Sequence, residues 1–241
     1  MPMKMKTLLK TNWTALFLTG LLVLGAGAAD IPSYPQADWE VLFDGEKVSG
    51  LRGYRRTEFP WNCWKIEDGV LKTVPGKKDR VDLVTIRQYE DFQLEFEWAA
   101  KGSSNGGVFY HAQETTGPIW HTAPEYQLLD DGGHHDGKNP KTSAGALYAM
   151  KAPNIDKILA PLQSFNRSKI VCNKGHVEHW LNGMLVVEYD WDGEEVRELI
   201  QTSKFKDKPK FMQFGKGHVG FQHHGEEIWL RNIRITVLKG S

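Results

Sequence analysis

The segment from Ala123 to His135 combines the alternation of a β-strand with side chains that could bind or react with a polar ligand. It reads APEYQLLDDGGHH. Glu125 and Gln127 are two positions apart, so in a strand they project from one face while Leu128 projects from the other. A carboxylate that accepts hydrogen bonds, beside an amide that both donates and accepts, suits the hydroxyl groups of a sugar. The alternative is an ordinary solvated strand face.

The glycine-rich continuation of this segment carries residue types that ligate metals. His134 and His135 follow Asp130 and Asp131 and precede Asp136. Carboxylate and imidazole groups suit hard and borderline divalent cations. The spacing matches neither an EF-hand loop nor an HExxH helix, and it favours a solvated loop. A divalent cation is therefore a hypothesis here.

A second group of candidates lies in SSNGGVFYH, which ends at His111. Its glycine pair permits a close approach of the backbone or a bulge, and Asn105 can contact a hydroxyl group. Strand periodicity predicts that His111 shares a face with Phe109. A histidine at this place can act on a ligand, or it can be an ordinary packed side chain.

Composition restricts the partners and the compartment. Lys and Arg together number 30, as do Asp and Glu, and the sequence pI is about 7.1, which excludes the basic surface typical of nucleic-acid binding. Three lysines precede an apolar run that ends in small residues near Ala29, the pattern of a signal peptide over residues 1–29. We therefore expect a periplasmic or extracellular domain over residues 30–241, without a membrane span, that binds a neutral or small ligand.

Period-two alternation recurs along the mature chain and predicts an all-β sandwich. The Asn182-Gly183 pair predicts a hairpin over residues 177–189 with a type I′ turn. Only residues 193–205 have helical spacing. Cys63 and Cys172 either form one disulfide or remain free and buried. The expected strands are 92–98, 108–111, 125–130, 145–150, 169–173, 177–181, 184–189, 218–224 and 228–238.

Seven segments in order resemble a family of secreted bacterial domains, the 3-keto-disaccharide hydrolase domain family. The resemblance implies a jelly-roll β-sandwich of two antiparallel sheets, similar to concanavalin A-like lectins and glucanases, with a sugar-binding concavity. The segments are WEVLFDGEKVSG (39–50), DFQLEFEW (91–98), SSNGGVFYH (103–111), EYQLLD (125–130), GALY (145–148), FNRSKIVCNKGHVEHWLNG (165–183) and GFQHHGEEIWLRNIRI (220–235).

The implied activity is cleavage of glycosides whose sugar carries a ketone at C3. The proton at C2 is then acidic, so a base can remove it and the C1–O bond can break by elimination, with water adding afterwards. The resemblance makes Glu125 the leading candidate for the base or a metal ligand, with His111 as a further catalytic candidate. Arg231 or His223 would donate to the ketone oxygen.

Other side chains are expected to hold the sugar. Asn105 and Gln127 would contact hydroxyl groups, and Trp120 and Tyr148 would stack on the ring. His179 shares a predicted face with Val177 and favours core packing. A noncatalytic carbohydrate-binding module with the same fold remains the alternative, because fold does not decide function. A glycosidase with two carboxylates is disfavoured, because the residue beside Glu125 on this face is an amide.

Overall fold

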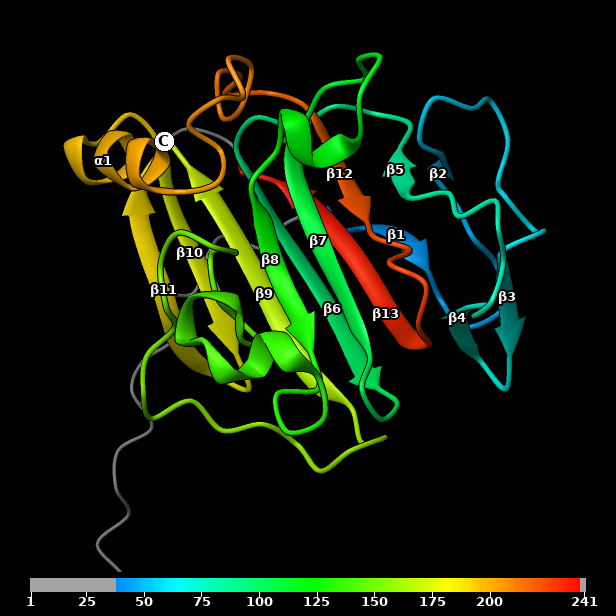
Figure 1. The fold of residues 1–241 in the computed structure, drawn as a ribbon. Coiled ribbons are helices and arrows are strands. Elements are labelled where there is room, and N and C mark those ends of the chain that lie inside the picture. Colours follow the sequence, from blue (N-terminus) through cyan, green and yellow to red (C-terminus); the bar gives the residue numbers. More distant parts are fainter. Residues whose placement is uncertain (1–37, 239–241) are drawn as a thin grey trace, which may run out of the picture. The chain divides into compact units, whose positions relative to one another are not determined.

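Alternating apolar residues build two antiparallel sheets that stack face to face and bury their inner sides against each other (Figure 1). The computed structural model describes residues 38–238, which belong to one compact unit, Gln36–Ser241. The predicted signal peptide, residues 1–29, lies outside the described residues. Within residues 38–238, no helix has both the length and the apolar character needed to cross a membrane.

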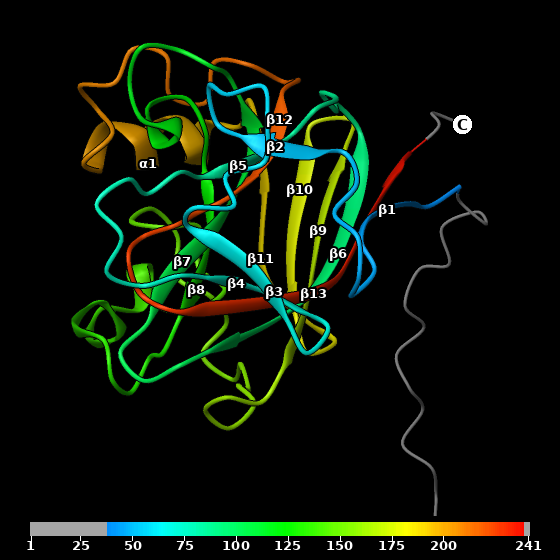
Figure 2. The same ribbon diagram turned by 90° about the vertical axis from the view of Figure 1, so that its right-hand side faces the viewer.

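The larger sheet has eight strands and forms the rear layer in Figure 1, as the side view in Figure 2 also shows. Its long strands β6 and β13 pair along most of their length, apart from one register shift. In sheet order the strands are β11 (Met184–Asp190), β10 (His176–Leu181), β9 (Asn166–Asn173), β6 (Phe92–Ala100), β13 (Ile228–Val237), β4 (Val70–Thr73) and β3 (Trp64–Glu67), with β1 (Glu40–Phe43) paired to β13.

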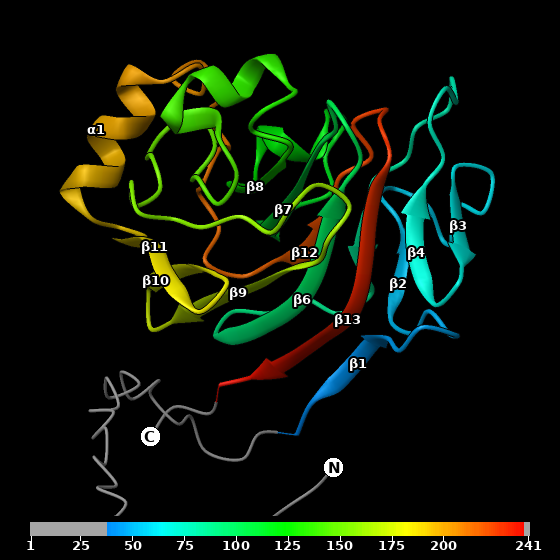
Figure 3. The ribbon, with the colours of Figure 1, turned by 90° about the horizontal axis from the view of Figure 1, so that it is seen from below.

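The smaller sheet has five strands and forms the front layer. The view from below in Figure 3 separates β7, β8 and β12 from the strands of the larger sheet. In sheet order the strands are β2 (Leu51–Gly53), β5 (Leu83–Thr85), β12 (His218–Phe221), β7 (Asn105–Ala112) and β8 (Glu125–Leu129). The helices are α1 (Glu194–Thr202) and three short 3-10 turns, η1 (Ile119–His121), η2 (His135–Lys138) and η3 (Pro140–Thr142).

This architecture confirms the predicted jelly-roll sandwich, its hairpin and its helix. Asn182 and Gly183 both have positive φ, 49° and 86°, as a type I′ turn requires. The predicted strand at 145–150 is wrong. Gly145 and Ala149 have positive φ, so the chain turns back on itself there and only Leu147 forms isolated bridges.

The main core lies between the sheets and contains most of the large aromatic side chains. His179 is fully buried in it, as expected, and its Nε2 is 2.8 Å from the Tyr110 hydroxyl. Cys63 and Cys172 are both buried and free, so the structure contains the second of the two states predicted for them.

A smaller apolar cluster covers the upper part of the outer face of the five-stranded sheet. The segment 113–123, which includes η1, crosses this face, and Ile119 packs above Gly220 of β12. The cluster comprises Val84, Phe109, Ala112, Ile119 and Ala123. The polar side chains further along β7 and β8 do not belong to this cluster.

Candidate active site

Glu125 and Gln127 lie on the outer face of the five-stranded sheet. The residue between them, Tyr126, packs in the main core, so the predicted parity of β8 holds. On β7, Phe109 is opposite Glu125 and Gly107 is opposite Gln127. Since Gly107 has no side chain, it leaves space above β7 beside both polar residues.

The Glu125 carboxylate occupies this space. A Cβ added at Gly107 would lie 2.0 Å from Oε1 of Glu125, so the side chain leans across the neighbouring strand. Glu125 is only 6% exposed, and within residues 38–238 its carboxylate makes no hydrogen bond. Burial raises its pKa to about 8; the charge of Lys204 opposes the rise, and Asp82 and Asp136 add to it. Glu125 therefore has the properties of a proton-transfer group that works near neutral pH.

A chain of polar contacts runs beside Glu125. The amide of Gln127 donates to Oδ1 of Asn105 at 3.4 Å, and the amide of Asn105 donates to Oδ2 of Asp136 at 3.3 Å. The Tyr148 hydroxyl donates to the same Asp136 oxygen at 3.4 Å. Oε1 of Gln127 is buried without a hydrogen-bond partner, which leaves it able to accept from a ligand. The loop with Asp136 is thereby tied to β7 and β8.

Lys204 brings a positive charge to the same place. It follows α1, and its ammonium lies 4.2 Å from the ring centroid of Tyr148 and 5.8 Å from that of Trp120. Both aromatic rings were predicted to stack on a sugar, and the structure places them around this cation. The site therefore contains a carboxyl group, amides, aromatic rings and an ammonium group.

Asp82 adds a second carboxyl group to this face of the sheet. It precedes β5 and is two residues from Val84, which points outward into the smaller cluster. Its Oδ1 accepts the backbone N–H of His223 at 2.8 Å. Burial raises the pKa of Asp82 to about 6, although this hydrogen bond works against the rise.

The loop after β8 brings together three residues whose side chains can ligate a metal ion. One ligand atom from each of His134, His135 and Asp136 lies within 4.8 Å of the others. His134 uses Nδ1 to accept the backbone N–H of Asp136, so its Nε2 is the atom left for a cation. Two imidazole nitrogens and a carboxylate that already accepts from Asn105 make this a candidate cation position beside the site.

A family profile described as the 3-keto-alpha-glucoside-1,2-lyase-like domain matches residues 38–236. The chain belongs to this family. It is 35% identical over 226 residues to a 3-keto-disaccharide hydrolase of Bacteroides thetaiotaomicron. The match covers 82% of this chain and 77% of that protein.

Solved structures show the same fold for this member of the lyase-like family. A candidate glycosyl hydrolase of Parabacteroides distasonis ATCC 8503 superposes with a TM-score of 0.75 at 28% identity, covering 83% of this chain and 94% of that one. A second candidate glycosyl hydrolase of the same strain gives 0.67 at 25% identity, covering 83% and 100%.

His111 does not belong to the site of this family member. A register shift in the pairing of β7 with β12 coincides with a φ of 52° at His111, which turns the side chain inward. Its ring centroid lies 4.6 Å from that of Trp191, and its Nε2 is 2.9 Å from the Glu90 carbonyl oxygen. The predicted face shared with Phe109 is therefore wrong.

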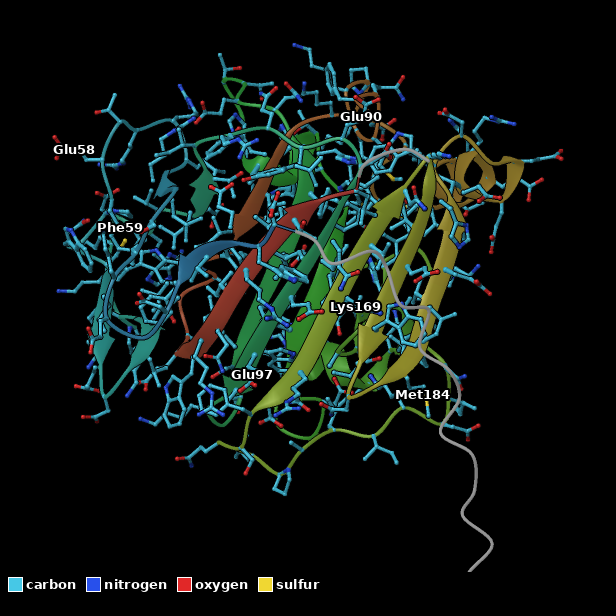
Figure 4. The ribbon with its side chains drawn as sticks, turned by 180° about the vertical axis from the view of Figure 1, so that it is seen from behind. Glu58, Phe59, Glu90, Glu97, Lys169 and Met184 are labelled. Atoms are coloured by element: carbon cyan, nitrogen blue, oxygen red, sulfur yellow. The ribbon has the colours of Figure 1, made fainter. Side chains whose placement is uncertain are left out.

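Arg231 also lies away from Glu125, on the outer face of the other sheet. Its Nε donates to Oε2 of Glu97 at 2.7 Å, and its guanidinium stacks 3.8 Å from the Phe165 ring centroid. Figure 4, seen from behind, shows Glu97 on this rear sheet. The two sheets separate Arg231 from β8, so it cannot donate to a ligand held by Glu125.

His223 points inward as well. It is 4% exposed, and its ring lies edge-on to Trp64 at 5.7 Å between centroids. Gln222, one residue earlier, donates its backbone N–H to Gly107 and has a buried Oε1 without a partner. Gln222 therefore takes the place beside the site that was expected of His223.

Two residues of this site, Lys204 and Asp82, were not predicted from the sequence motifs. Lys204 lies in a short segment after α1 and Asp82 lies just before β5, so neither is close in sequence to Glu125. The only local signal for the direction of the Asp82 side chain was its spacing of two residues from Val84, which places both side chains on the same face of a strand. No local signal marks Lys204, because only the packing of α1 and the segment after it brings this residue to Tyr148.

Proposed function

We propose that this protein is an exported enzyme that cleaves glycosides whose sugar carries a ketone at C3. The observation that carries the proposal is the Glu125 carboxylate, buried on the outer face of the five-stranded sheet without a hydrogen bond to the described residues. The family membership and the name of the Bacteroides relative support this substrate class.

Glu125 acts as the base in this mechanism. Its carboxylate takes the proton from C2, and the electron pair of that C–H bond forms the C2–C3 double bond of an enolate, which places the negative charge on the ketone oxygen. When the ketone re-forms, this pair moves to form the C1–C2 double bond and the C1–O bond breaks. The proton on Glu125 passes to the departing oxygen, which leaves as an alcohol. Water then adds across the double bond and gives the free 3-keto sugar. A pKa of about 8 lets Glu125 both accept and return the proton near neutral pH.

Donors around Glu125 stabilise the negative charge that develops on the ketone oxygen. The ammonium of Lys204 and the hydroxyl of Tyr148 lie on the same side of the site. Burial and the neighbouring carboxylates raise the pKa of Tyr148, so its hydroxyl stays protonated and can donate. Such preorganised donors commonly supply the largest single contribution to catalysis.

A divalent cation would be held by His134, His135 and Asp136. When bound, it would supply Lewis-acid polarisation of the ketone. Metal analysis of protein purified without a histidine tag, with His134→Ala as the matched variant, tests this position. Near-stoichiometric metal in the wild type and its loss in the variant are expected, and no bound metal in either would remove the cation from the proposal.

Export rests on residues 1–29. The full chain expressed in a Gram-negative host should be recovered from the periplasm or medium with its N-terminus at about Asp30. Recovery of the uncleaved chain from the cytoplasm would contradict export of this protein.

The activity is tested by incubating the mature protein with a 3-keto-glucoside and with the unoxidised glucoside. We expect cleavage of the keto substrate alone, and a loss of about 10²-fold or more in Glu125→Gln. Glu97→Gln, on the rear sheet, is the matched control and should retain activity. Binding of plain oligosaccharide without turnover of either substrate would instead indicate a carbohydrate-binding module. Cleavage of the unoxidised glucoside would indicate a classical glycosidase.

A further inference from the structure

A pocket of about 620 Å³ opens at the β2 and β5 end of the five-stranded sheet. Tyr54 and the chain at 116–118 form part of its wall, and Asp82, which precedes β5, belongs to the same lining. Its most distinctive feature is a concentration of guanidinium groups, contributed by Arg55, Arg56 and Arg80.

Two of these arginines have no ion-pair partner among the described residues. Arg56 is paired with Asp79 at 3.0 Å, so its charge is compensated. Arg55 donates through Nη1 only to the Thr116 carbonyl at 3.1 Å, and Arg80 donates only to the His224 carbonyl. Each guanidinium carries five N–H groups, so most of the donors on Arg55 and Arg80 remain free.

The backbone holds Arg55 in this position. Its φ is 57°, an uncommon value for a residue other than glycine, and its N–H donates to Oε1 of Glu114 at 2.5 Å. Glu114 is itself paired with Arg52 at 2.7 Å, so its charge does not cancel that of Arg55. Asp82 is the one carboxyl group of the lining, and it already accepts the His223 N–H. The lining therefore keeps a net positive charge at neutral pH.

The pocket lies within reach of a substrate held at Glu125. Strands β5, β12 and β7 are consecutive neighbours, and Glu125 leans over β7 at Gly107. Two strand spacings, about 10 Å, therefore separate the strand beneath the carboxylate from the strand next to Asp82, a span comparable to a disaccharide. The charge of Asp82 also contributes to the raised pKa of Glu125, as expected for groups that share one cleft.

We propose that this pocket, lined by Arg55 and Arg80, is the subsite for the leaving group, and that it selects leaving groups bearing an anion such as a carboxylate, sulfate or phosphate. This inference rests on the proposed function, because it assigns the leaving group of the same reaction. Guanidinium groups bind such oxyanions in bidentate geometry, and they do so better in a concave site than on an open surface.

The test uses two 3-keto-glucosides, those of 3-hydroxybenzoate and 3-hydroxybenzamide, which are similar in size and differ by one charge. We expect kcat/KM to be at least tenfold higher for the benzoate, and the preference to fall as salt is added. The double variant R55Q/R80Q should lower the benzoate value at least tenfold more than it lowers the benzamide value, so that the two substrates become equal. Arg167→Gln removes one charge from the rear sheet and should preserve the preference.

Equal kcat/KM for the two substrates, or a preference that survives in R55Q/R80Q, would overturn the inference. A failure of the proposed function is distinguishable, because neither keto substrate would then be cleaved. In that case the dissociation constants of the two unoxidised glucosides show whether the pocket is an anion subsite. At least tenfold tighter binding of the benzoate, lost in R55Q/R80Q, supports an anion subsite, and equal binding rejects it.

Discussion

The carboxylate of Glu125 on β8 lies directly above the backbone of Gly107 on β7, where an added Cβ would be 2.0 Å from Oε1. The side chain can take this position only because its neighbour has no side chain. Gly107 pairs with Gln127 rather than with Glu125, so the carboxylate is placed diagonally across the strands. The position of the proposed base therefore depends on Gly107, a residue of the neighbouring strand that has no reactive group of its own.

Replacing Gly107 by alanine should displace Glu125 and reduce turnover. The new methyl group would overlap the carboxylate, so we expect kcat to fall by about 10²-fold, the scale of losing a positioned base. Gly215→Ala is the matched control, because a Cβ there would meet no atom within 4 Å. Steady-state kinetics with a 3-keto-glucoside, together with melting temperatures, check this. Unchanged kcat in G107A would contradict the placement of the base.

The rate should rise with pH through the pKa of Glu125. The base must be ionised to accept the C2 proton, and burial places its pKa at about 8. Thus kcat/KM at low substrate should increase about tenfold from pH 7 to pH 9. A rate that falls over this interval would show that Glu125 works in its protonated form. Glu125→Gln should lose this dependence along with most of the activity.

Lys204→Met should lower activity and also shift this pH profile. The ammonium stabilises the developing oxyanion, so its loss is expected to reduce kcat by about 10²- to 10³-fold. Because the charge of Lys204 lowers the pKa of Glu125, the midpoint of the pH profile should move to higher pH. Lys204→Arg should retain part of the activity and should shift the midpoint of the pH profile less than Lys204→Met does.

Lys208→Met is the control for Lys204. Its ammonium lies 5.1 Å from the Trp120 ring centroid, but its charge does not contribute to the pKa of Glu125. Lys204 would be removed from the proposed mechanism if the pH profile of activity were unchanged in K204M. An equal shift of this profile in K208M would have the same consequence.

His179 should make the fold sensitive to acid without taking part in the reaction. Burial lowers its pKa to about 3 from an ordinary 6.5, so the unfolded chain takes up a proton at a pH where the folded protein cannot. This contribution to the free energy of unfolding is present above pH 6.5 and is lost as pH falls towards 3. Between pH 6.5 and 5 the loss is about 2 kcal/mol.

His179→Leu should reduce that pH dependence. It is also expected to lower the free energy of unfolding at pH 7 by about 1–3 kcal/mol, because the Tyr110 hydroxyl and the Gly145 carbonyl lose a partner. Denaturant titrations at pH 7 and pH 5 measure both effects. A pH dependence in H179L equal to that of the wild type would argue against this source of acid sensitivity.

Local sequence features were sufficient for the sheet elements that depend on neighbouring residues. The Asn182-Gly183 turn, the helix α1 and the side-chain directions on β8 follow from backbone preferences and from period-two alternation, which act within a few residues. For the same reason the sequence identified Glu125 with Gln127 as one face. It failed at 145–150, where positive φ at Gly145 and Ala149 overrides an apolar pattern.

The membership of the site was decided by the tertiary structure. A backbone irregularity turns His111 inward, pairing with Glu97 holds Arg231 on the opposite sheet, and Lys204 reaches Tyr148 from beyond α1. None of these relations is encoded in the spacing of neighbouring residues, because each depends on which strands pair and which segments pack across them. The sequence by itself determined the sandwich, the family and the candidate carboxylate. The stacking of the sheets and the path of the segments over the front sheet determined which side chains surround it.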